Sequence, residues 1–134
     1  MDQSLIYVST RCAGAEDGAT DVRDIVAVSR PRNASLEVTG ALVATPTCFA
    51  QILEGPEAAL AELMASIRDD PRHRDIRLVD LGGRAKRDFA GWSLAYSGES
   101  TYVGQAIGQM MGARDFDFPK YVNRLYFVIR TFVE

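Results

Sequence analysis

The chain has 134 residues, of which 47% are hydrophobic, so it can form one domain with a substantial core but not two ordinary domains. Its 15 basic and 18 acidic residues give a formal net charge of -3, which argues against nucleic acid or an anionic membrane as a partner. Two cysteines and one histidine predict neither a metal cluster nor Ser-His-Asp catalysis, and the lack of a membrane-length apolar run or signal-peptide pattern predicts a cytoplasmic protein.

The first part of the chain alternates between strand and helix patterns. Residues 5–8 form a β-rich run with apolar side chains on both faces, which predicts a central strand. After a loop, a helix is predicted to start at residues 20–21, with apolar residues repeating every three or four positions. Pro31 is predicted to end this helix near Arg30, because proline has no N–H and restricts the residue before it. Residues 32–34 would then form a turn.

A hairpin is predicted next. Residues 38–44 form its first strand, where Gly40 indicates a bulge or a close approach by another group. A short turn leads into a second strand, which is centred on Gln51. Pro56 then begins a helix, and residues 69–71 end it.

The remainder of the chain adds two strands and two helices. Strands are predicted at residues 76–81 and 92–96, and helices at residues 103–112 and 118–133. The order of elements is that of an α+β, ferredoxin-like βαββαβ sheet with a fifth strand. Two helices are expected on one face of this sheet and the two C-terminal helices on the other.

Gln51 is the residue that most needs an explanation. It alternates with Phe49 and Leu53 along one face of its strand, so an amide occupies a row of apolar side chains. A buried carboxamide without partners costs about 1–3 kcal/mol, so a polar group is expected in front of this strand. Tyr7, Asn33 and Trp92 are expected to converge on the same place, although a core tyrosine, a helix cap and a packing tryptophan are the plain alternatives.

Five spaced segments of the chain resemble successive signatures of the BLUF family, the flavin-binding blue-light sensors. The segments are LIYVS, SRPRNASLEVTGAL, FAQILEGP, IRDDPRHRDI and FAGWSLAY. They agree in order over residues 4–97, so the resemblance is more specific than any single motif. It implies a short-type BLUF protein without a C-terminal effector domain. Residues 1–98 would be the flavin-binding domain, and residues 99–134 a helical cap of the same globular unit that serves as an output or oligomer surface.

The resemblance also implies a photochemical role for two residues. Tyr7 would be the electron donor, and Gln51 would link it to N5 and O4 of a bound isoalloxazine ring. Asn33 would bond the O4 and N3 edge of that ring. The other cofactor-binding residues that the family implies are Ile25, Ser29, Arg32, Phe49, Ile67, Asp70, Arg72 and His73. FAD is the expected flavin, bound non-covalently, with FMN and riboflavin as alternatives.

The chain departs from the family pattern at two positions. The family's W-x-M becomes Trp92-Ser93-Leu94, on the fifth strand that would carry the signal to the C-terminal helices. Leu94 lacks the sulfur that accepts a weak hydrogen bond from the Gln amide, so we expect an altered lit-state lifetime and altered signalling. The family's FFQ becomes Phe49-Ala50-Gln51. Ala50 points away from Gln51 and is expected to change packing under the C-terminal helices.

The final predicted helix is apolar round much of its circumference, which is typical of a deeply buried helix or of half an interface. The resemblance to a short-type BLUF protein implies a sensor rather than an enzyme, and we expect it to act through a homo-oligomer or a downstream partner protein. Three alternatives are a flavin-free BLUF-like adaptor, an acyl-phosphate hydrolase on the same fold, and an RNA-binding sheet. The hydrolase would need a phosphate-binding loop with a paired acid and base, and the RNA-binding sheet a basic face with exposed aromatics, and the sequence predicts neither.

Overall fold

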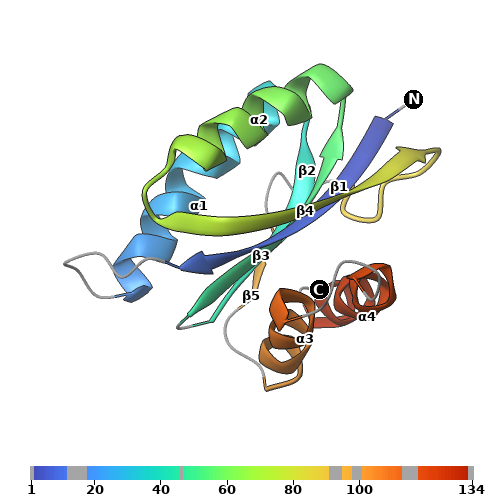
Figure 1. The fold of residues 1–134 in the computed structure, drawn as a ribbon. Helices are drawn as coiled ribbons and strands as arrows, with labels where there is room; N and C mark the ends of the chain where they lie inside the picture. The colour runs from blue at the N-terminus through green and yellow to red at the C-terminus, as the bar shows by residue number, and fades with distance from the viewer. Residues whose placement is uncertain are drawn as a thin grey trace.

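A five-stranded sheet forms the centre of the protein (Figure 1). The computed structural model describes residues 2–11, 18–45, 47–90, 95–97, 101–112 and 118–132. The strands are β1 (Asp2–Arg11), β2 (Thr39–Ala44), β3 (Cys48–Gly55), β4 (His73–Arg84) and β5 (Ala95–Ser97). Their order across the sheet is β4-β1-β3-β2-β5. Neighbouring strands run antiparallel, except that β5 runs parallel to β2.

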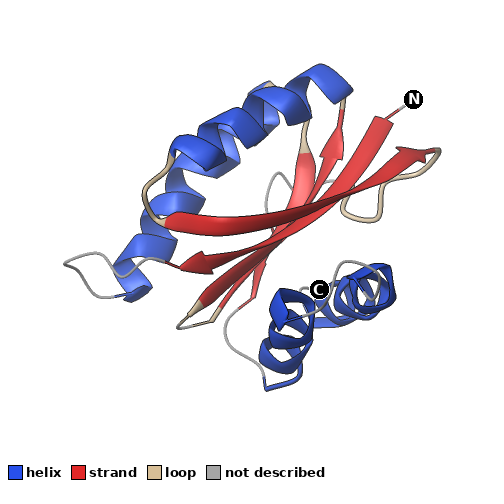
Figure 2. Cartoon of the chain, viewed as in Figure 1, coloured by secondary structure: helices blue, strands red, loops and turns tan. Residues whose placement is uncertain are grey.

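Helices cover both faces of the sheet (Figure 2). Helices α1 (Gly18–Ser35) and α2 (Glu57–Asp69) lie on one face, and α3 (Thr101–Gly112) and α4 (Phe118–Phe132) lie on the other. This arrangement confirms the predicted α+β, ferredoxin-like fold. None of the described helices has both the length and the apolar character needed to cross a membrane.

Alternation along the strands gives the protein a core on each side of the sheet. On β1, Ile6 and Val8 belong to the core under α3 and α4, whereas Leu5 and Tyr7 belong to the core under α2. On β3, Ala50 lies in the core under α3 and α4, as its position relative to Gln51 predicted. Each inner strand is therefore buried on both faces, and the apolar runs that predicted central strands are explained.

The predicted end of the first helix at Arg30 is wrong. Helix α1 continues through Pro31 to Ser35, so the turn expected at residues 32–34 is helical. Proline deprives the carbonyl of Ala27 of its usual N–H partner. Both Ala27 and Pro31 are exposed, so water can take that hydrogen bond, and the interruption costs less than it would inside a core.

The backbone of Glu37 ends α1 instead. Glu37 has a φ of 58°, the left-handed conformation that commonly follows the last turn of a helix. The carbonyl oxygen of Asn33 accepts hydrogen bonds from the N–H of Leu36 at 3.2 Å and from that of Val38 at 2.8 Å. This reversal sends the chain directly into β2 and fixes Asn33 in the last turn of the helix.

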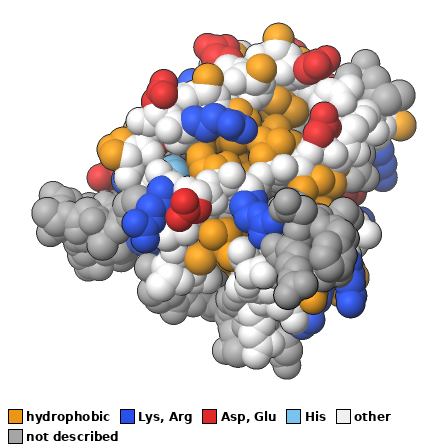
Figure 3. All heavy atoms as spheres, in the orientation of Figure 1, with side chains coloured by type: hydrophobic (Ala, Val, Ile, Leu, Met, Phe, Trp, Pro, Cys, Tyr) orange, Lys and Arg blue, Asp and Glu red, His pale blue; other side chains and the backbone are white. Residues whose placement is uncertain are grey.

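Hydrophobic side chains gather on the surface where α2 faces β4 (Figure 3). A cavity of about 160 Å³ lies there, with Leu60 and Met64 of α2 and Leu78 of β4 among its lining residues. The carboxylates of Glu57 and Asp80 belong to the same lining. This cavity is separate from the one that contains Gln51, because the two have no lining residue in common.

Candidate functional site

A cavity of about 140 Å³ lies between α1, α2 and the sheet. Every residue predicted to bind a cofactor lines this cavity except Phe49. These lining residues are Tyr7, Ile25, Ser29, Arg32, Asn33, Gln51, Ile67, Asp70, Arg72 and His73. The fold therefore brings together side chains from two helices, three strands and the turn after α2.

Tyr7 and Gln51 form a hydrogen-bonded pair on the floor of the cavity. They stand directly opposite each other in the antiparallel register of β1 and β3, and they are only 1% and 5% exposed. The Tyr7 hydroxyl donates to Oε1 of Gln51 at 2.5 Å. Within the described part of the chain, Tyr7 is the only hydrogen-bond partner of the Gln51 side chain. The NH2 group of Gln51 is thus available to a ligand in the cavity.

The Tyr7 phenol holds its proton strongly. Burial raises the pKa of Tyr7 well above its ordinary value, and the negative charge of Asp70 raises that pKa further. The phenol is therefore neutral throughout the physiological pH range. In this pair, Tyr7 is the donor and the amide carbonyl of Gln51 is the acceptor.

One face of α1 forms a wall of the cavity. Ile25, Ser29, Arg32 and Asn33 follow one another at intervals of four, three and one, so they share a helix face only because α1 continues beyond its proline. Asn33 is 2% exposed. Arg32 reaches across to α2, where its Nη1 donates to Oγ of Ser66 at 2.7 Å. This hydrogen bond joins the two helices that enclose the cavity.

An ion pair follows the end of α2. The guanidinium of Arg72 contacts both carboxylate oxygens of Asp70, with 2.7 Å between Nη2 and Oδ2. The backbone N–H of Arg72 also donates to Oδ1 of Asp70 at 2.9 Å. Partial burial would raise the pKa of Asp70, but the hydrogen bonds and charge of Arg72 outweigh this effect and hold the pKa below its ordinary value. Asp70 is thus a fixed negative charge beside the cavity.

His73, at the start of β4, separates Phe49 from the cavity. Its Nδ1 lies 2.8 Å from Oγ of Ser9, and its ring centroid lies 4.6 Å from that of Phe49 and 6.0 Å from that of Tyr7. Burial lowers the pKa of His73, so the imidazole is neutral at pH 7. Phe49 is fully buried against this ring with Leu42, which explains why it is missing from the cavity lining.

Other lining residues were not singled out from the sequence: Val28, Leu42, Leu53, Leu63 and Ser66. Leu53 could have been found from the sequence, because it lies two residues after Gln51 and so on the same face of the strand. Leu63 could have been found because it belongs to the apolar stripe of α2. Leu42 follows only from the register, which places it opposite Gln51. Ser66 carried no signal, because its partner Arg32 lies on a different helix.

The two residues expected to transmit a signal, Trp92 and Leu94, lie outside the described residues. The described chain resumes with β5 at Ala95, which pairs with Ala41 of β2. The fifth strand therefore borders β2 at the edge of the sheet. The strand of Gln51 is the next one inward.

The side chains of the cavity fit a flavin ring in their chemistry. Ile25, Leu63 and Ile67 offer apolar walls to a fused tricycle, and the amides of Asn33 and Gln51 offer both donors and acceptors to its polar edge. The cavity volume of about 140 Å³ is less than the roughly 300–1,000 Å³ of most small-molecule sites. A three-ring ligand therefore requires side chains of the walls to move apart.

The cavity has both polar and apolar lining residues and is enclosed by two helices and a ferredoxin-like sheet. This arrangement is typical of an α+β domain that binds a small ligand. The sequence profile of the BLUF family, described as sensors of blue light using FAD, matches residues 3–95. The chain belongs to the BLUF family. The cavity between α1 and α2 is accordingly the candidate flavin site.

Relatives of known function and solved structures agree with this assignment. Photoactivated adenylate cyclase subunit beta of Euglena longa is 38% identical over 97 residues, which make up 72% of this chain and 11% of the cyclase subunit. The BLUF protein BlrB in its dark state superimposes with a TM-score of 0.80 at 30% identity, over 97% of this chain and 96% of BlrB. The photo-activated state of BlsA gives a TM-score of 0.75 at 25% identity, over 93% of this chain and 94% of BlsA.

Proposed function

We propose that the protein is a blue-light photoreceptor that binds a flavin, FAD in the first place, without a covalent bond in the cavity between α1 and α2. The observation that supports this most is the buried hydrogen bond from Tyr7 to Gln51 on the cavity floor. Asn33 and Gln51 would hold the polar edge of the ring, and Ile25 and Ile67 its apolar faces. When bound, the flavin absorbs blue light and becomes a strong oxidant.

Tyr7 and Gln51 carry the photochemical response in this proposal. Tyr7 would give one electron to the light-excited flavin and pass its phenolic proton to Oε1 of Gln51, 2.5 Å away. Gln51 would release a proton from its nitrogen to the flavin, and the return of one electron and one proton to Tyr7 would restore the phenol. The amide then differs from its starting state in orientation or tautomer, which changes the hydrogen bonds it offers to the ring. Such a change shifts the absorption without any bond to the flavin.

The output would leave through the fifth strand and the C-terminal helices. We propose that residues 1–98 sense light and that residues 99–134 present the changed surface to a second copy of the chain or to a downstream protein. The exposed ring of Phe127 on α4, 69% accessible, is a suitable contact for such a partner. The chain would then act as a sensor rather than as an enzyme. In the Euglena relatives the matching region is a small part of a much longer cyclase subunit.

A flavin-free adaptor is the alternative that a specific observation favours. The limited cavity volume and the hydrogen bond between Arg32 and Ser66 suit a closed pocket whose outer surface does the work. The two proposals predict different colours for the purified protein. A flavin-binding protein is yellow when purified from cells that make flavin, whereas an adaptor is colourless and does not take up added FAD.

Tyr7→Phe tests the proposed function directly. The variant is expected to remain yellow, because Tyr7 is only one of the many residues that line the cavity. It is expected to lose the light-induced red shift, because the electron and proton donor is gone. The measurement is the absorption spectrum before and after blue light. Tyr121→Phe, the same change on α4 and far from the cavity, is the matched control and is expected to keep the shift. A normal shift in Tyr7→Phe would contradict the proposed role.

A further inference from the structure

A buried carboxylate stands on the other side of the strand that carries Gln51. Glu54 is 1% exposed and follows Gln51 by three residues on β3, so it faces the core under α3 and α4. Its Oε2 accepts the backbone N–H of Asp88 at 2.7 Å. Its Oε1 accepts the backbone N–H of Phe89 at 3.0 Å and the hydroxyl of Thr39 at 2.9 Å.

These hydrogen bonds attach the segment before β5 to β3. Burying a carboxylate is unfavourable unless strong hydrogen bonds compensate, and bonds from backbone N–H groups to a charged acceptor are among the strong ones. Arg87 binds the same region from outside. Its Nε lies 2.7 Å from Oδ2 of Asp2, and its Nη1 donates to Thr39 at 3.3 Å. The segment at residues 87–89 is therefore held to the sheet by polar contacts as well as by packing.

The same segment is attached to α4. The hydroxyl of Tyr126 donates to Oδ2 of Asp88, and Nη2 of Arg130 lies 3.8 Å from Oδ1 of Asp88. The ring of Phe89 meets that of Tyr126 edge to face, with 6.4 Å between the centroids. Phe89 itself is 1% exposed within the core that includes Ile129 of α4. One short segment thus contacts the Gln51 strand on one side and the last helix on the other.

A second arrangement of the carboxylate is available nearby. Ser4 lies directly opposite Glu54 in the register of β1 and β3, so the two side chains share a face of the sheet. The hydroxyl of Ser4 is buried and has no hydrogen-bond partner among the described residues. A carboxylate that turns toward Ser4 gains a donor there and loosens its hold on Asp88 and Phe89. Such an exchange has the two discrete states that a switch requires.

We propose that Glu54 is a positioning residue that couples the Gln51 strand to α4, by holding the backbone of residues 88 and 89 against β3. This inference rests on the proposed photoreceptor function and names the route of its output. Glu54 is not among the residues that line the cavity of Gln51. A movement of β3 at Gln51 reaches Asp88 and Phe89 through their hydrogen bonds to Glu54, and reaches α4 through Tyr126.

The test uses Glu54→Gln in the full chain loaded with FAD. Glutamine keeps the shape of the side chain, but its NH2 group replaces one carboxylate oxygen, so one of the two backbone N–H donors faces another donor and loses its acceptor. Two quantities are measured in each protein: the light-induced absorption shift, and the difference in amide hydrogen exchange of α4 between light and dark. The unmodified protein is expected to show both. Glu54→Gln is expected to keep the shift and to lose the exchange difference at residues 118–132.

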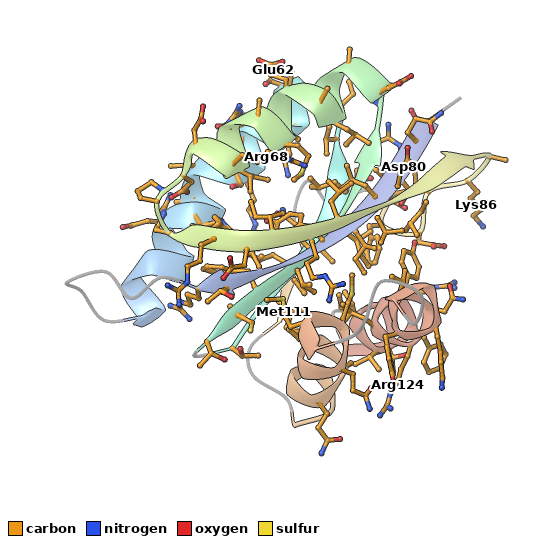
Figure 4. All side chains as sticks on the ribbon, viewed as in Figure 1. Glu62, Arg68, Asp80, Lys86, Met111 and Arg124 are labelled. Carbon is orange, nitrogen blue, oxygen red and sulfur yellow. The ribbon has the colours of Figure 1, made fainter. Side chains whose placement is uncertain are left out.

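Two further variants make the result specific. Glu62→Gln is the matched control, because Glu62 lies on the exposed side of α2 and points away from the sheet (Figure 4). It is expected to change neither quantity. Tyr126→Phe removes the hydrogen bond from α4 to Asp88 at the other end of this link, while the ring contact with Phe89 and the contact of Arg130 with Asp88 remain. It is expected to behave as Glu54→Gln does, and it decides the question if Glu54→Gln fails to fold.

The outcomes separate the two proposals. A purely structural role for Glu54 would raise exchange at α4 equally in light and dark, and the light-dependent difference would persist. The inference is overturned if the light-dependent difference in hydrogen exchange at α4 persists in either Glu54→Gln or Tyr126→Phe. It is also overturned if the unmodified protein shifts its absorption without any change in hydrogen exchange at α4. An unmodified protein that shows no absorption shift overturns the proposed function, and this coupling with it.

Discussion

Gln51→Leu is expected to abolish the light-induced red shift of the flavin-loaded protein and to leave the flavin bound. Leucine keeps most of the volume of glutamine but can neither accept the Tyr7 proton nor present a changed hydrogen bond to the ring. The measurement is the absorption spectrum before and after illumination, at matched flavin occupancy. Gln3→Leu, on β1 and outside this cavity, is the control and is expected to keep the full shift.

The same variant is expected to lower stability through Tyr7. The Tyr7 hydroxyl is buried, and Gln51 is the partner that the structure gives it. Leaving that hydroxyl unpaired costs about 1–3 kcal/mol in the free energy of unfolding. In a double-mutant cycle measured by urea unfolding, Tyr7→Phe with Gln51→Leu should cost less than the sum of the single variants, because no polar group is then left unpaired. Additive costs would mean that the hydrogen bond does not couple the two residues.

Gly40→Ala is expected to destabilise the fold by at least about 3 kcal/mol. A Cβ at Gly40 would lie 2.0 Å from the carbonyl oxygen and 3.1 Å from the carbonyl carbon of Ile52. That carbonyl belongs to the backbone of β3 in the middle of the sheet, so it cannot turn aside as a flexible side chain would. Because Ile52 adjoins Gln51, a displaced β3 should also weaken flavin binding. Urea unfolding and flavin titration measure the two effects.

Gly108→Ala is the matched control for this clash. Gly108 is exposed on α3, and a Cβ there would meet nothing within 4 Å. Alanine in place of an exposed helical glycine is expected to raise stability by about 0.5–1 kcal/mol. If Gly40→Ala were as stable as Gly108→Ala, the close approach of β2 and β3 at Gly40 would have to be abandoned. The glycine in that strand would then have no steric explanation.

Much of the fold could be predicted from local patterns. Runs with alternating apolar residues, or with apolar residues on both faces, identified the inner strands. The order of strands and helices along the chain identified the ferredoxin-like fold. The end of α1 was predicted wrongly because the effect of Pro31 depends on solvent exposure, which the sequence does not reveal. An unpaired carbonyl at Ala27 costs little where water reaches it. Strands β1 and β4 extend past their predicted apolar cores, because ladder pairing reaches polar residues such as Arg11 and His73.

The site was predictable to the extent that family motifs mark it. Gln51 on an apolar row was conspicuous on physical grounds alone, and the motifs supplied Asn33, Asp70 and Arg72. Contacts between distant elements left no such trace. The hydrogen bond from Arg32 to Ser66 joins residues 34 positions apart, and Glu54 is held by backbone N–H groups, whose positions depend on the fold and not on residue type.

The most direct measurement is the absorption spectrum of the unmodified protein, with FAD bound, before and after blue light. If the amide of Gln51 faces a flavin and is rearranged through Tyr7, the flavin bands shift to the red on illumination and return in the dark. A protein that takes up no flavin, or whose flavin bands stay in place under blue light, would contradict this account.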